Sequence, residues 1–147
     1  MSLNHVWITR IRDVEREYLV MRLAADRLLS AASVDPTVLL GTLRPRELGV
    51  ASANLEGTYL VRLFAEFESG AREYWSTIRV TNPKTVDLLT GLAAQRLIPD
   101  LLRDNVQSVR DYRNSWVHER AVVPQVIPID IARGYLCRFF SFLPLQW

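Results

Sequence analysis

The stretch LEGTYLVRLFAEFESGAREYWSTI, residues 55–78, decides the fold, because its apolar side chains recur at steps of three and four residues. This spacing is typical of one face of an amphipathic α-helix. The apolar positions are Leu55, Tyr59, Leu60, Leu63, Phe64, Phe67, Ala71, Tyr74, Trp75 and Ile78, and Glu56, Arg62, Glu66 and Glu73 lie mostly elsewhere on the helical wheel. The aromatic side chains among these positions predict that this helix carries much of the aromatic core. Gly70 costs about 1 kcal/mol relative to alanine inside a helix, so we expect another helix to cross closely there.

Further helices are expected on both sides of this stretch. An apolar stripe over residues 6–32 ends at Asp35-Pro36, and a shorter stripe covers residues 84–94. Pro99-Asp100 opens a helix that runs to about residue 119, and a last helix covers residues 130–142. No hairpin turn and no repeat is evident. The predicted fold is therefore all-α, a compact up-and-down bundle of four or five helices in one domain, residues 1–147.

Composition favours an ordinary globular protein, with 49% apolar and 23% charged residues. The single cysteine, Cys137, cannot form an internal disulfide, so we expect a reducing compartment. No stretch resembles a signal peptide or approaches the ~20 apolar residues of a membrane span. These observations predict a soluble, cytoplasmic protein with no membrane partner.

The net charge of +2 comes almost wholly from arginine, since Lys84 is the sole lysine. Arginine's planar fork suits phosphate and RNA, but a general arginine bias can equally reflect genome composition. Only the placement of individual arginines therefore bears on function.

The chemical centre of the sequence is Arg113-Asn114-Ser115-Trp116-Val117-His118. An imidazole moves protons near neutral pH, and a guanidinium holds phosphate by parallel hydrogen bonds. Arg113 is expected at the edge of an apolar helix face formed by Ile98, Leu102, Val106, Val109 and Trp116. It must therefore meet a carboxylate such as Glu56 or Glu66, a subunit interface, or a cleft open to an anion.

The other face of this helix gathers Arg103, Arg110, Asn114 and His118 within an arc of about 80°. This strip could bind phosphates, but the neighbouring Asp104 and Asp111 would also suit an ordinary solvated face with local ion pairs. Arg113 and His118 lie about 140° apart on a continuous helix. Either the helix ends near Trp116 and lets His118 fold back, or two copies face each other and combine two histidines as acid and base.

The sequence lacks the residues that form the common metal and nucleotide sites. His5 has no Asp, Cys or His at a metal-ligand spacing, and the chain has neither a phosphate-binding glycine-rich loop nor a G-x-S-x-G motif. We expect no metal and no cofactor.

The motif Arg113-Asn114-x-x-x-His118, late in a helical chain and followed by one more helix, resembles that of the HEPN superfamily, in which Arg precedes His by a few residues and a polar residue follows the Arg. This resemblance implies a metal-independent endoribonuclease that dimerises through the motif helix. It also implies toxin, defence or RNA-processing settings, with an antitoxin or nucleotidyltransferase as a possible partner.

By this resemblance, His118 activates the ribose 2′-hydroxyl or protonates the leaving oxygen, Arg113 stabilises the phosphorane, and Asn114 orients the phosphate or His118. The expected products are a 2′,3′-cyclic phosphate and a 5′-hydroxyl. Arg103, Arg110 and Arg120 are the candidate RNA-binding residues. Two alternatives remain: a non-catalytic module that binds nucleotide or protein, and a purely structural bundle in which Arg113 is held in an intramolecular ion pair.

Overall fold

The computed structural model describes residues 2–118, 122 and 124–147. Its elements are α1 (Leu3–Val34), the short 3₁₀-helix η1 (Pro36–Leu39), α2 (Pro45–Ile78), α3 (Thr85–Arg96), α4 (Asp100–Val117) and α5 (Ile129–Phe140). The described residues contain no strand, which confirms the all-α bundle. In the same part of the chain, no helix is both long and apolar enough to cross a membrane.

Helix α2 is the centre of the packing, as its sequence predicts. The rings of Phe64 and Phe67 are fully buried, and Phe67 meets Phe139 and Phe140 of α5 edge-on, with ring centroids 5.5 and 5.3 Å apart. A Cβ atom at Gly70 would lie 2.6 Å from the Phe140 ring and 2.6 Å from the Trp7 ring. The close helix crossing expected at Gly70 is therefore confirmed, and it joins α1, α2 and α5.

Helix α2 begins at Pro45, well before the stretch that predicted it. Proline at the first helical position has a φ angle already suited to the helix, and the Glu47 carboxylate accepts the backbone N–H of Arg44 at 2.7 Å. This extra length lets α2 run antiparallel to the whole of α1.

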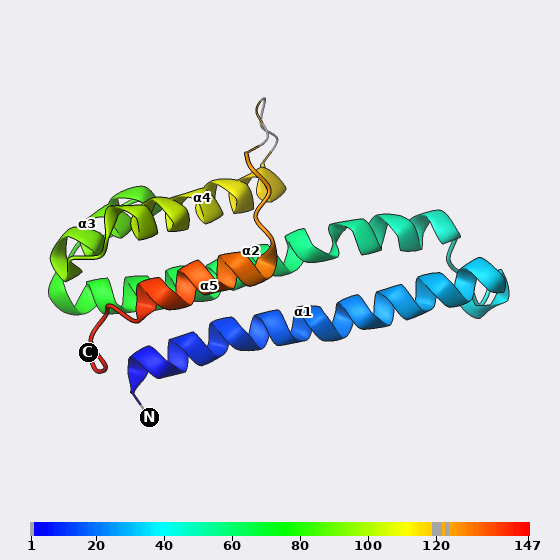
Figure 1. The fold of residues 1–147 in the computed structure, drawn as a ribbon, viewed down its shortest axis with the longest axis horizontal. Helices are drawn as coiled ribbons and strands as arrows, with labels where there is room; N and C mark the ends of the chain where they lie inside the picture. The colour runs from blue at the N-terminus through cyan, green and yellow to red at the C-terminus, as the bar shows by residue number, and fades with distance from the viewer. Residues whose placement is uncertain (1, 119–121, 123) are drawn as a thin grey trace.

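The three later helices cover only part of the α1–α2 hairpin, and its closed end projects as an arm of two helices (Figure 1). We define the arm as residues 19–54, of which only Ala32, Leu39 and Ser52 are buried. The sequence did not predict the arm, because amphipathic patterns say which face of a helix is apolar but not how far its neighbours extend.

Candidate functional site

Helix α4 buries Leu102, Val106, Val109 and Tyr112, and it packs against α2, α3 and α5. Trp116, which the helical wheel placed on the same face, is instead 40% exposed. Its indole lies against the backbone of α2 at Gly57, where an added Cβ would come within 2.2 Å of the ring. The ring therefore covers the surface of α2 and leaves its outer side to solvent.

Arg113 reaches inward from α4 and has a carboxylate partner. Its Nη2 donates to Glu68 Oε2 at 3.1 Å, and its guanidinium carbon lies 4.8 Å from the centroid of the Phe64 ring. The sequence suggested Glu56 or Glu66 as this partner, and both suggestions were wrong. Glu56 accepts the backbone N–H of Ile129 at 2.9 Å, and Glu66 pairs with Arg10 at 2.9 Å. A purely structural bundle requires Arg113 to be held in an intramolecular ion pair. Such a pair is present, with Glu68 as the acidic partner.

Glu68 holds three helices together at this point. Its carboxylate accepts hydrogen bonds from Arg72 Nη2 at 2.7 Å and from Thr85 Oγ at 2.6 Å, in addition to the bond from Arg113. Burial by itself raises the pKa of the Glu68 carboxyl, but the hydrogen bonds from Thr85 and Arg72 and the charges of Arg72 and Arg113 hold it below its usual value. Glu68 is therefore a firmly ionised anchor for Arg113.

Beside this network lies a polar cleft of about 460 Å³. Its lining consists of Glu68, Lys84, Thr85, Val86, Arg110, Arg113 and Asn114. The cleft thus contains three cationic side chains, those of Lys84, Arg110 and Arg113. Its one carboxylate, Glu68, already accepts the hydrogen bonds described above. Arg110 donates to the neighbouring Asp111 at 2.6 Å, but its side chain still lines the cleft. The arrangement can hold a phosphate group, because the guanidinium and ammonium groups carry more donors than the protein acceptors here use.

The structure brings together Arg110, Arg113 and Asn114, and it adds Lys84. Sequence reasoning missed Lys84 as a site residue, because only the turn between α2 and α3 carries it to α4. Arg103 is not part of this group: it pairs with Asp100 at 3.0 Å and Asp104 at 2.9 Å, and it lines a different hollow.

His118 stands apart from the cleft. Helix α4 ends at Val117, and His118 follows in an extended conformation, with its backbone N–H donated to the Asn114 carbonyl at 2.9 Å. Its side chain is exposed and is not among the residues that line the cleft. The helix therefore ends close to Trp116, as it must if His118 is to fold back toward Arg113. Even so, the imidazole of His118 does not reach the cleft at Arg113 within one chain.

Within the described ranges, no group of three or more His, Cys, Asp or Glu side chains is placed to hold a metal ion. Arg120, the third candidate RNA-binding residue, lies outside the described residues.

The resemblance to the HEPN superfamily rests on the residues of α4 and on the helix order, since comparison with known proteins adds nothing to it. No protein-family model, no curated protein and no solved structure matches this chain.

Proposed function

We propose that this chain is a metal-independent endoribonuclease of the HEPN type, which holds a phosphate of RNA in the cleft at Arg113. The observation that carries the proposal is that Arg113 and Asn114, the paired residues of the motif, line one cleft with Arg110 and Lys84. The ion pair with Glu68 and the contact with Phe64 fix the guanidinium before any ligand arrives. A fixed cation stabilises developing negative charge without having to reorganise during the reaction.

The proposed reaction is an internal transesterification. A base removes the proton of the ribose 2′-hydroxyl, the 2′-oxygen bonds to phosphorus, and the bond to the 5′-oxygen breaks as that oxygen receives a proton. Arg113 stabilises the charge on the phosphorane oxygens, Asn114 orients the phosphate, and His118 moves the proton. The products are a 2′,3′-cyclic phosphate and a 5′-hydroxyl.

The position of His118 means that the proposal requires two chains. Because the imidazole of one chain lies outside its own cleft, a second copy must supply the histidine, or both copies must supply one each. The exposed end of α4, with Trp116 40% and Val117 48% exposed, offers an apolar contact next to His118.

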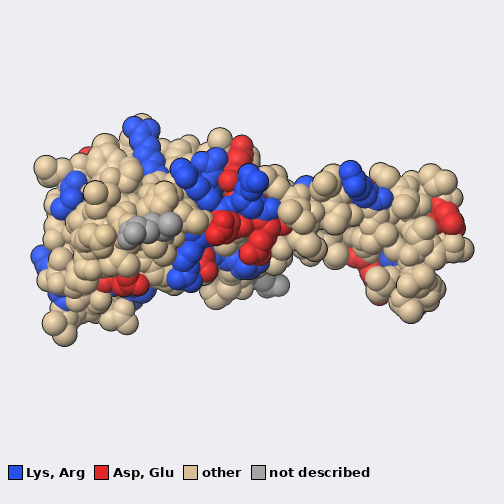
Figure 2. All heavy atoms as spheres, turned by 90° about the horizontal axis from the view of Figure 1, so that it is seen from below, with Lys and Arg blue, Asp and Glu red and all other residues tan. Residues whose placement is uncertain are grey.

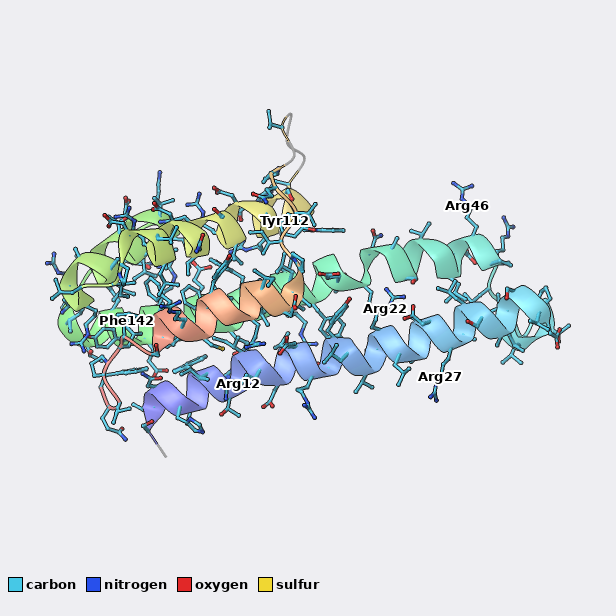
Figure 3. The ribbon with its side chains drawn as sticks, viewed as in Figure 1. Arg12, Arg22, Arg27, Arg46, Tyr112 and Phe142 are labelled. Atoms are coloured by element: carbon cyan, nitrogen blue, oxygen red, sulfur yellow. The ribbon has the colours of Figure 1, made fainter. Side chains whose placement is uncertain are left out.

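The first test is cleavage of a single-stranded RNA in EDTA by the wild-type protein and by Arg113→Ala and His118→Ala. We expect activity to persist in EDTA and to fall by at least about a hundredfold in each variant. Arg46→Ala is the matched control, since it removes one exposed arginine from the far end of the arm (Figure 3). Cleavage that needs magnesium, or that survives both site substitutions, would contradict the proposal.

The second test counts the histidines needed for one cleavage. An equal, fully exchanged mixture of wild-type and His118→Ala chains keeps about a quarter of its dimers intact, since random pairing squares the wild-type fraction. If both histidines are needed, activity falls as that square, whereas independent motifs leave about half. A linear decline with the mutant fraction would reject the two-histidine mechanism.

A second candidate function is a non-catalytic module that binds a nucleotide or RNA phosphate in the same cleft. The separation of His118 from the cleft favours it, since binding needs only the cations. RNA binding that is lost in Arg113→Ala, together with no cleavage at any protein concentration, would select this candidate.

A further inference from the structure

For its length, the arm exposes more large apolar side chains than the rest of the described molecule. The described chain has twenty large hydrophobic side chains that are exposed, and half of them lie between Leu19 and Val50. Figure 2, which views the molecule from the α1 side, shows charged side chains gathered over its middle and a narrow arm that is mostly uncharged. Exposed apolar surface gathered in one region indicates a contact with another molecule.

Helix α1 has two apolar stripes in the arm, and α2 covers one of them. The covered stripe continues from Tyr18 through Ala25 and Leu29 to Ala32, and it includes Arg22, whose Nη1 donates to the Ser52 carbonyl at 2.9 Å. Figure 3 agrees, since Arg22 points toward α2 and Arg27 points away from it.

The second stripe lies about 100° around the helix from the first and consists of Met21, Ala24, Leu28 and Ala31. All four side chains are exposed, with Met21 at 44% and Leu28 at 37%. Their spacing of three, four and three residues is that of the apolar seam of a coiled coil. An uncharged seam with this spacing suits another helix rather than a nucleic acid.

The seam is complementary to itself when two copies run antiparallel. A two-fold axis near residue 26 places Met21 opposite Ala31 of the second copy and Leu28 opposite Ala24. Each large side chain then faces a small one, which lets the helices approach closely without voids. The same register directs the η1 end of the second copy toward a groove of about 580 Å³. Three charged side chains, Asp13, Arg16 and Glu17, line this groove together with Val20, Met21 and Tyr59.

The exposed surface area of the chain is also large enough to supply a dimer interface. A compact monomer of 16.9 kDa is expected to expose about 7,700 Å². This chain exposes 8997 Å², an excess of roughly 1,300 Å² over that expectation. A stable protein interface covers about 800 Å² on each partner, so the excess is sufficient for one.

We propose that the Met21–Ala31 stripe is a homodimer interface, in which the arms of two copies pack antiparallel into a four-helix unit. This interface is distinct from the contact at the end of α4 that ribonuclease activity requires. The occupant is a second copy because the large and small positions of the seam match under two-fold symmetry.

The experiment is light scattering across micromolar concentrations, with Leu28→Glu and Ala24→Glu compared with Leu23→Glu. Leu23 is exposed on the same helix at 53%, but it lies on the other flank. We expect each seam variant to halve the molar mass of the wild-type assembly and to raise its dissociation constant at least about a hundredfold, because a glutamate would be buried without a partner. Leu23→Glu should keep the wild-type mass, and circular dichroism should show equal helix content in all the variants.

A wild-type chain that stays at 16.9 kDa would overturn the proposal and leave the seam to a different protein. A seam variant that keeps the wild-type mass would also overturn it, because the assembly would then depend on another surface such as the end of α4. Loss of mass in Leu23→Glu as well would show that the effect is not specific to the seam and would overturn it too. RNA cleavage by His118→Ala mixtures reports on the α4 contact alone, so each proposal can fail without the other.

Discussion

Replacing Glu68 by glutamine separates the structural role of Arg113 from its proposed role in binding. The substitution keeps the shape of the side chain but removes the charge that Arg72 and Arg113 share. Breaking a buried ion pair costs about 3–5 kcal/mol, and the Glu68 side chain is 19% exposed, so water compensates part of the loss. We expect the free energy of unfolding to fall by about 2–3 kcal/mol, which corresponds to a melting temperature lower by roughly 5–10 °C.

The same change should strengthen phosphate binding. Removing one negative charge about 6 Å from a bound phosphate, with an effective dielectric constant near 40, is worth about 1.4 kcal/mol, or roughly tenfold in affinity. The assay is fluorescence anisotropy of a short single-stranded RNA at fixed salt, in the His118→Ala background so that the RNA stays intact. Glu17→Gln is the control, since it makes the same charge change at a carboxylate that is 52% exposed and pairs with Arg62.

An unchanged or weaker RNA affinity in folded Glu68→Gln, relative to Glu17→Gln, would refute this reasoning. An unchanged affinity would mean that the guanidinium serves packing alone, and the purely structural interpretation of Arg113 would stand. A weaker affinity would mean that Glu68 acts by positioning Arg113 and that this effect outweighs its negative charge. A loss of stability without a gain in RNA affinity would indicate a structural role of Arg113, whereas a loss of stability with a gain in RNA affinity would indicate a role in binding phosphate.

Two further predictions concern stability. The pKa of Glu68 is lowered in the folded state, so its contribution to stability is present above its usual value near 4.5 and is lost as the pH falls through the lower folded pKa. Urea unfolding between pH 6 and pH 3 should therefore show a steeper loss for the wild type than for Glu68→Gln, and parallel curves would contradict this. Gly70→Ala should lower the unfolding free energy by about 1–2 kcal/mol, because the new Cβ would overlap the Phe140 and Trp7 rings. Gly49→Ala, with nothing within 4 Å, should raise it by about 0.5–1 kcal/mol, and equal effects at the two glycines would exclude the close crossing.

The helices could be predicted because their signals are local. The apolar periodicity of residues 55–78 identified the core of α2, and Gly70 marked a crossing that the structure confirms. The beginning of α2 at Pro45 was missed, since residues 45–54 have few large apolar side chains and bury only Ser52. The arm could not be predicted, because its existence depends on where α3, α4 and α5 stop covering the hairpin.

The site could be predicted only in part. The sequence showed that Arg113 needs a partner, but it suggested Glu56 and Glu66 instead of Glu68. A local signal for Glu68 existed: it lies one turn after Phe64, so both side chains face α4 and Arg113 contacts the ring and the acid together. Lys84 gave no such signal, since its approach to Arg110 depends on how α3 folds back against α4.

The two proposed contacts between copies have different consequences for the active site. Antiparallel arms overlap over residues 18–34, a length of about 24 Å, so the bodies of the two chains lie at opposite ends of that overlap. The arm interface alone therefore holds the two Arg113 clefts far apart and cannot complete either one with a second His118. A chain that uses both surfaces has two distinct two-fold contacts and forms a closed tetramer or an open chain of dimers. If the wild type is a dimer that Leu28→Glu converts to monomers, a composite site would have to form only on RNA, and cleavage would then rise with the square of protein concentration at low enzyme levels.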